Sequence, residues 1–390
     1  MDVSHRTTRS GIGRINRGCR QWLPSSCAGV GSCRRQYGGS GTTGESVTLG
    51  NRLSNDHAVL RGRGTQPPPH FQPGGVIART VDGGKHWTVQ HRDGDRQLHG
   101  ISCPSTTRCY VIGSYYPGPG RRGIGTIFRT QNGGLTWQQS PAPFQSLPIE
   151  VACPGLTTCF IPATSADDRT IVLTTSDGGT TWSKRQIALQ PSGHSGTIAC
   201  PTPQVCNVYG HHGTGTGVMR TRDAGRSWRL LPGTDMPARI GNHNYADRAS
   251  VACPSTRVCY TADGDAQDTC DGCVPFGVIF GTQDGGVHWR RLYTGAGQDS
   301  VLGPIVCPGI SVCYAVGVTG LDRAGNEFIL STRNGGQTWT KRRLPAGQES
   351  AFATPKALAC PSVHVCYIAS RLGPAIFRTS DGGRTWQILP

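Results

Sequence analysis

The segment RTSDGGRTW, residues 378–386, is the last of seven closely similar segments in this 390-residue chain. The others are RTVDGGKHW (79–87), RTQNGGLTW (129–137), TTSDGGTTW (174–182), RTRDAGRSW (220–228), GTQDGGVHW (281–289) and STRNGGQTW (331–339). Each contains Thr, then Asp or Asn two residues later, a glycine two residues after that, and a closing Trp. Self-similarity at a spacing of about fifty residues predicts a repeat architecture.

The Asp or Asn of each segment is expected to have a structural role in a tight turn. Its side chain can accept hydrogen bonds from N–H groups of its own turn, and the glycines can adopt positive φ without strain. Asn132 and Asn334 stand where other copies have Asp, and an amide cannot act as a general acid, base or nucleophile. The structural set is Asp82, Asn132, Asp177, Asp223, Asp284, Asn334 and Asp381, with the core-filling Trp87, Trp137, Trp182, Trp228, Trp289, Trp339 and Trp386.

Twelve of the 17 cysteines form a second repeat, CPxxxxC, at the same spacing. We call each of these cysteine pairs a clip. The pairs are Cys103/Cys109, Cys153/Cys159, Cys200/Cys206, Cys253/Cys259, Cys307/Cys313 and Cys360/Cys366. Strand-like sequence flanks each pair, so the two cysteines are expected to face each other across a hairpin, within reach of a disulfide. Zinc is the rival interpretation, but six pairs on six separate repeats cannot easily converge in fours.

Disulfides imply an extracellular or cell-envelope protein. The first 44 residues contain seven Arg and one Asp but lack the apolar core of a secretory signal. We expect residues 1–44 to be a disordered basic segment. The alternative is a displaced first repeat, because Cys27 and Cys33 have the spacing of the other cysteine pairs but lack the Pro.

One repeat can be divided into four strands: one ending at CP, one starting at the second Cys, one of the type TIFRT before the turn, and one starting at Trp. The composition agrees, because 56 glycines and 27 prolines are typical of many short strands joined by turns. Six repeats are complete, and segments 45–50 and 57–62 supply the first two strands of a seventh. The sequence therefore predicts an all-β, seven-bladed β-propeller of four-stranded antiparallel blades over residues 45–390.

The motif T-x-[DN]-[GA]-G-x-[THS]-W resembles the Asp box, or bacterial neuraminidase repeat. This repeat occurs in sialidases, sortilin-type receptors, some xyloglucan-cleaving enzymes and photosystem II assembly-factor-like propellers. The resemblance covers residues 76–390 and implies the propeller fold with structural Asp-box turns. It does not fix the function, because one fold hosts many activities, and the CP clips depart from the assembly-factor group.

The formal net charge of +16 favours acidic partners. Nucleic acid is not expected as a partner, because the arginines are spread along the chain and no basic run is interleaved with aromatic residues. No apolar run approaches the ~18 residues of a membrane span. We expect a monomer that binds a protein or glycan.

The loops opposite the clips differ from blade to blade, and varied loops on a rigid scaffold are where binding residues are usually found. Arg and Tyr are typical of recognition surfaces. The candidates on this face are Tyr115, Tyr116, Arg121, Arg122, Asp167, Asp168, Arg169, His211, Arg239, His243, Tyr245, Asp247 and Arg323. The same side chains are also ordinary solvated loop residues.

Four aspartates in one loop form a candidate calcium site: Asp263, Asp265, Asp268 and Asp271. Closely spaced carboxylates suit calcium, but the spacing is not that of an EF-hand, and Cys270 and Cys273 can tie the loop by a local disulfide. A solvated acidic loop is the simpler interpretation, and a metal site that uses the two thiols is a third. No other cofactor is expected.

A non-catalytic binding or scaffold module is the favoured function, and a glycoside hydrolase is the alternative. A sialidase resemblance would require an RIP-type motif, an arginine cluster and a Tyr–Glu pair. The chain has no RIP, and its four glutamates show no evident partner. Other glycosidases need two converging carboxylates.

Overall fold

The structure is a computed structural model that describes residues 46–49, 57–61, 75–118, 121–189, 197–212, 215–231, 250–265, 276–295, 299–319, 326–345, 357–369 and 376–389. In β1, β2 and parts of some other strands, only the backbone is described. All described residues belong to the compact unit 42–390. The segment 1–44, for which we expect disorder, lies outside the described residues.

The described strands form seven antiparallel sheets of four strands, numbered here as sheets 1–7 in chain order. Sheets 1–4 contain β1 (Ser46–Leu49), β2 (His57–Arg61), β3 (Gly75–Arg79), β4 (Thr88–Asp93); β5 (Gln97–Ser102), β6 (Cys109–Tyr115), β7 (Ile124–Thr130), β8 (Gln138–Pro141); β9 (Leu147–Pro148), β10 (Cys159–Thr164), β11 (Thr170–Thr175), β12 (Ser183–Gln186); β13 (Thr197–Ala199), β14 (Cys206–His212), β15 (Gly215–Thr221) and β16 (Arg229–Leu230). Sheets 5–7 contain β17 (Ser250–Ala252), β18 (Cys259–Asp265), β19 (Phe276–Thr282), β20 (Arg290–Thr294); β21 (Asp299–Val306), β22 (Cys313–Thr319), β23 (Asn326–Thr332), β24 (Thr340–Arg343); β25 (Ala357–Ala359), β26 (Cys366–Ala369), β27 (Ile376–Thr379) and β28 (Gln387–Leu389). A short 3-10 helix, η1 (Pro143–Gln145), joins β8 to β9.

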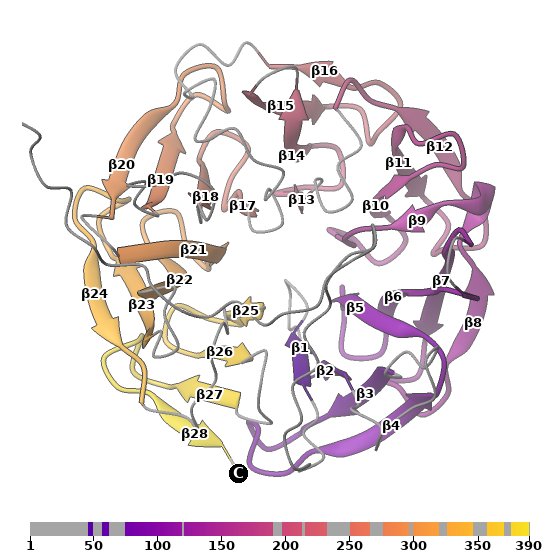
Figure 1. The fold of residues 1–390 in the computed structure, drawn as a ribbon, viewed down its shortest axis with the longest axis horizontal. Helices are drawn as coiled ribbons and strands as arrows, with labels where there is room; N and C mark the ends of the chain where they lie inside the picture. The colour runs from indigo at the N-terminus through magenta and orange to yellow at the C-terminus, as the bar shows by residue number, and fades with distance from the viewer. Residues whose placement is uncertain are drawn as a thin grey trace, which may run out of the picture. The chain divides into compact units, whose positions relative to one another are not determined.

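Within this unit the sheets follow one another around a ring, with the first strand of each sheet innermost and the fourth outermost (Figure 1). The middle strands are buried on both faces, as in the run Cys109–Ser114 of β6. Both faces are covered because each sheet packs between two neighbours, and burying one large apolar side chain stabilises the fold by about 1.5–3 kcal/mol. The outer strands β8, β12 and β24 are exposed along their whole length.

Seven apolar clusters fill the spaces between consecutive sheets, and one of them closes the ring. In that cluster Val76 and Ala78 of sheet 1 pack with Tyr367 and Leu389 of sheet 7. Since β28 pairs with β27 of its own sheet, the ring closes by side-chain packing and not by exchange of a strand. The repeated tryptophans pack against these clusters, as expected from the sequence.

These observations confirm an all-β propeller with four-stranded antiparallel blades. The strands expected at 45–50 and 57–62 correspond to β1 and β2. Their side chains lie outside the described residues, so the count of seven blades, which depends on this first sheet, stays a prediction.

A local network of hydrogen bonds explains the repeated Thr-x-Asx-x-Gly pattern. In all seven copies the Thr hydroxyl donates to Asx Oδ1 at 2.8–2.9 Å and accepts from the N–H of the glycine four residues after the Thr at 2.8–2.9 Å. Asx Oδ1 also accepts the N–H four residues on. The Ser227 hydroxyl and N–H bonds lower the pKa of Asp223 to about 2, so this carboxylate stays ionised at neutral pH. We call each such segment an Asx–Gly turn.

All six clips predicted from the sequence are disulfides. Each clip loop accepts a hydrogen bond of 2.7–3.1 Å from the Asx–Gly turn of its own sheet, for example from Gly382 N to His364 O. The clips and turns therefore lie on one face of the ring, which agrees with strand alternation. The ends of the second strands and the starts of the third strands, where the structure describes them, lie at the opposite face.

Arginines at the Asx–Gly turns link neighbouring sheets. The Arg79 and Arg129 guanidinium groups donate to Gly133 O (3.0 Å) and Gly178 O (3.3 Å) in the next sheet. Arg220 donates to Gly285 O, and Arg333 donates to Gly382 O at 3.0 Å. Part of the positive charge thus stabilises the contacts between sheets, where hydrogen bonds from charged donors are stronger than neutral ones.

We expect Thr332→Val to destabilise the protein by about 1–3 kcal/mol, because it leaves the buried Gly336 N–H without its acceptor. Valine has nearly the shape of threonine, so packing is kept. The control is Thr340→Val on exposed β24, which should change stability by less than about 0.5 kcal/mol. Urea unfolding of both variants tests this, and equal stabilities would show that the turn network contributes nothing.

Candidate functional site

Three loops of sheets 2 and 3 meet on the face opposite the clips. They are the described parts of the β6–β7 loop (116–118 and 121–123), the β8–β9 connection (142–146) and the β10–β11 loop (165–169), which we call the 2–3 loop cluster. Tyr116 packs on Gly123 beside Leu147, and the Ser146 carbonyl lies close to Gly125. The Ala142 N–H donates to Gly125 O at 2.8 Å, which fixes the connection against the start of β7.

Arg122 joins the two sheets within this cluster. Its guanidinium donates to the carbonyls of Ser165 and Ala166 and lies 3.4 Å from the Asp168 carboxylate. The Arg122 side chain is 36% exposed and that of Asp168 is 80% exposed, so one side of the pair faces solvent. Both residues were predicted from the sequence as candidate ligand-binding residues of the loops, and the structure brings them together.

Asp167 is held by its own loop. The Ser165 hydroxyl donates to its Oδ1 at 2.6 Å, and the Arg169 guanidinium lies 3.9 Å away. The Ser165 hydrogen bond is the largest effect that lowers the pKa of Asp167. Asp167 is therefore an ionised acceptor and not a proton donor at neutral pH.

Strained backbone is concentrated in the same cluster. Four non-glycine residues among those described have positive φ: Phe144 (59°), Gln145 (51°), Asp168 (54°) and Ala224 (59°). Ala224 replaces a turn glycine, whereas the other three belong to the 2–3 loop cluster. Such conformations persist only when surrounding contacts hold them, and they often mark functional sites. Here they present Phe144, which is 44% exposed, with the Lys184 ammonium 5.0 Å from its ring.

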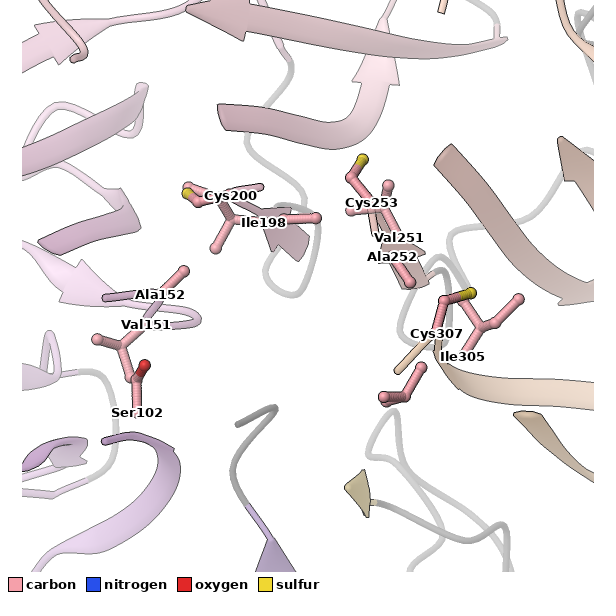
Figure 2. Close-up of a pocket in the computed structure, with 12 residues that line it drawn as sticks. Ser102, Val151, Ala152, Ile198, Cys200, Val251, Ala252, Cys253, Ile305 and Cys307 are labelled. Carbon is pink, nitrogen blue, oxygen red and sulfur yellow. The ribbon is translucent and has the colours of Figure 1, made fainter. Parts of the chain in front are cut away.

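A small cavity of about 90 Å³, shown in Figure 2, lies among the inner ends of sheets 2–6 and is lined by small and apolar residues and by their backbone. Its lining includes the residue that precedes the first cysteine of five clips: Ser102, Ala152, Ala199, Ala252 and Val306. No Asp, Glu, His, Lys or Arg is among the described residues that line it. The Ser102 hydroxyl accepts the Cys153 N–H at 3.0 Å and so caps the edge of the neighbouring sheet.

Glu150 caps an inner strand in the same way. Among the described residues it is the one carboxyl group near the cavity whose pKa is strongly shifted. Its Oε2 accepts the N–H of Ile198, a lining residue, at 2.7 Å. Burial raises the pKa of Glu150 to about 8, against the opposing effect of that hydrogen bond. The carboxyl is thus a neutral group that satisfies an inner-strand N–H at pH 7.

The other candidates on this face are only partly described. Tyr115 is half-buried with the Arg96 guanidinium 6.0 Å from its ring, Arg121 is exposed, and His211 lies in β14 with its side chain outside the described residues. Arg239, His243, Tyr245, Asp247 and Arg323 lie outside the described residues. They stay predictions.

The calcium hypothesis is also untested. Asp263 and Asp265 lie in β18, opposite Val278 and Phe276 of β19, and only their backbone is described. Asp268 and Asp271 lie outside the described residues, as do Cys270 and Cys273. Within the described residues no group of three or more His, Cys, Asp or Glu could hold a metal.

Neither the exposed aromatic side chain of Phe144 nor the capping role of Glu150 was predicted from the sequence. Phe144 stands in the short segment PAPFQS between two strands, where Pro143 is the available signal for a turn. Glu150 precedes a clip by three residues, and Ser250 holds the same position in sheet 5 and accepts the Ile305 N–H at 3.2 Å. That correspondence could have marked the position as a cap.

No protein-family profile matches the chain, and no curated protein matches it. A GH74 enzyme of Niastella koreensis superposes with a TM-score of 0.56 at 14% identity, covering 89% of this chain and 55% of its own. YCF48 bound to D1 peptide has a TM-score of 0.48 at 17% identity, covering 76% and 81%. Trypanosoma rangeli sialidase with the inhibitor DANA has 0.47 at 10%, covering 74% and 55%.

At these identities the likeness concerns the fold alone. This chain spans about half the length of the GH74 enzyme and of the sialidase. The fold does not choose between catalysis and binding, because one fold hosts many activities. No helix in the described part of the chain is long and apolar enough to cross a membrane.

Proposed function

We propose that the protein is a non-catalytic binding or scaffold module that holds a protein or glycan ligand at the 2–3 loop cluster. The observation that supports this proposal most is that the cluster contains three non-glycine residues with positive φ, together with the exposed ring of Phe144 and the Arg122–Asp168 pair, one side of which faces solvent. The exposed Tyr116 and Ile124 add apolar area next to these charges. Aromatic and Arg side chains together are typical of binding hot spots.

We further propose that the propeller has seven blades, that its turns are Asp boxes of the sialidase-like superfamily, and that the protein acts as a monomer. The six disulfides support an extracellular or cell-envelope location, because such bonds persist in oxidising compartments. Calcium binding at the Asp263–Asp271 loop belongs to the same proposal as an optional feature.

A glycoside hydrolase is the second candidate, and Glu150 is the observation that favours it. A general acid needs a raised pKa, and that of Glu150 is about 8. However, one Glu150 oxygen is occupied by the Ile198 N–H, and the described cavity lining offers no second carboxylate. Since inverting and retaining glycosidases both use two, binding is the better-supported function.

The binding site is tested with a random peptide phage library and a glycan array, each probed with the whole protein. We expect a ligand class to be enriched, and its affinity to fall at least tenfold in Tyr116→Ala and in Phe144→Gly, a loss of ~1.4 kcal/mol or more. Glycine tolerates the positive φ of residue 144, so Phe144→Gly should fold as well as the native protein.

The matched controls are Leu135→Ala and Leu156→Ala, which remove exposed apolar side chains from the clip face. Affinity that falls equally in these controls, or enrichment of nothing from either library, contradicts the proposal. A panel of fluorogenic glycosides is assayed in parallel. Turnover that disappears in Glu150→Gln would establish the hydrolase instead.

A further inference from the structure

The outermost strands of sheets 3, 4, 5 and 6 carry a concentration of positive charge that the linear sequence does not reveal. Their sequences are SKRQ, RL, RRLYT and TKRR, and none of the four strands contains Asp or Glu. The basic residues are Lys184, Arg185, Arg229, Arg290, Arg291, Lys341, Arg342 and Arg343, and all eight are exposed. We call them the basic edge.

The fold produces this concentration from residues about fifty positions apart. Each repeat places its fourth strand at the outer end of its sheet, so β12, β16, β20 and β24 lie at the outer edge of four consecutive sheets (Figure 1). The distribution is one-sided, because β8 and β28 contain no charged residue and Asp93 accompanies Arg92 in β4. Among described residues no carboxylate lies within ion-pair distance of Arg185, Arg290 or Arg342.

We propose that the basic edge binds a linear anionic polysaccharide, a function separate from ligand binding at the 2–3 loop cluster. Like charges on neighbouring strands repel one another. A polymer that brings several anionic groups at once relieves this repulsion at several strands together and so binds more tightly than a single anion. The edge follows the outside of the ring, and a flexible chain follows such a path more readily than duplex DNA, whose bending costs free energy.

Two further observations favour a polysaccharide over nucleic acid. The four strands contain one aromatic residue, the half-buried Tyr293, whereas proteins that hold single-stranded nucleic acid stack bases on several exposed rings. The clips also require oxidising conditions, where acidic polysaccharides are ordinary partners.

The test measures binding of the whole protein to heparin and to a DNA duplex of matched charge, by isothermal titration at two salt concentrations. We expect heparin to bind more tightly than the duplex, with an affinity that falls as salt rises. The triple variant Arg185→Gln/Arg290→Gln/Arg342→Gln should bind heparin at least tenfold more weakly at low salt.

The control is Lys85→Gln/Arg257→Gln/Arg384→Gln, which removes the same charge from exposed positions on the clip face. It should retain heparin affinity within about twofold, and the melting temperatures of both variants verify folding. An equal loss in the control, or no heparin binding at low salt, overturns the proposal. Tighter binding of the duplex than of heparin overturns it in favour of nucleic acid. Neither variant touches Tyr116 or Phe144, so failure here is distinct from failure at the loop cluster.

Discussion

Complete reduction of the six clips is expected to lower the melting temperature by at least about 15 °C. A cross-link that closes a loop of this size contributes about 2 kcal/mol by restricting the unfolded chain, so six contribute on the order of 10 kcal/mol. That amount is comparable with the entire free energy of unfolding of a typical domain. The clip loops also accept the N–H of an Asx–Gly turn, and loosening them weakens those bonds as well.

The measurement is thermal unfolding followed by circular dichroism, with and without a reductant that reaches buried disulfides. Thiol titration after denaturation verifies the redox state. Of 17 cysteines, 12 are in clips, so the non-reduced protein should show no more than five free thiols. The single-clip variant Cys103→Ala/Cys109→Ala should lose about 2 kcal/mol. An unchanged melting temperature with twelve additional thiols would show that the hydrogen bonds alone hold the hairpins.

The features predicted from sequence are those determined by neighbouring residues. The network that joins Thr379, Asp381 and Gly383 spans five positions, so the residue types at fixed spacing are enough to specify it. A clip likewise joins cysteines six residues apart. Because these local units repeat, they also determined the four-stranded blade and its propeller arrangement.

The contacts between sheets could not be predicted in the same way. Arg220 reaches Gly285, 65 residues later, and nothing in its local sequence distinguishes it from the solvated Arg222. Arg122 and Asp168 were both candidates as loop residues, but their pairing depends on the relative position of two sheets. The basic edge was missed for a related reason: charges that are dispersed along the chain gather only when each repeat places its last strand at the outside.

Glu150→Gln is expected to raise the melting temperature by several degrees at pH 8 and to change it little at pH 4. The raised pKa of Glu150, about 8, means that the folded protein keeps this proton while the unfolded chain loses it near the ordinary value of 4.5. The folded state therefore binds more protons between these two values, and its stability falls as pH rises from about 4.5 to 8. Each unit by which the pKa differs between the folded and unfolded states corresponds to about 1.4 kcal/mol, so the free energy of unfolding falls by a few kcal/mol over this pH range.

Glutamine removes this pH dependence because its amide oxygen accepts the Ile198 N–H without a proton to lose. Two variants serve as controls in melts from pH 4 to 9. Leu135→Ala removes an exposed side chain that does not titrate and should give a pH-independent difference from the native protein. Glu150→Ala leaves the Ile198 N–H unpaired and should destabilise at acidic pH, where the neutral glutamic acid still accepts that bond. A Glu150→Gln difference that is the same at pH 4 and pH 8 would mean that this carboxyl titrates normally, which would also remove the observation that favours a general acid beside the cavity.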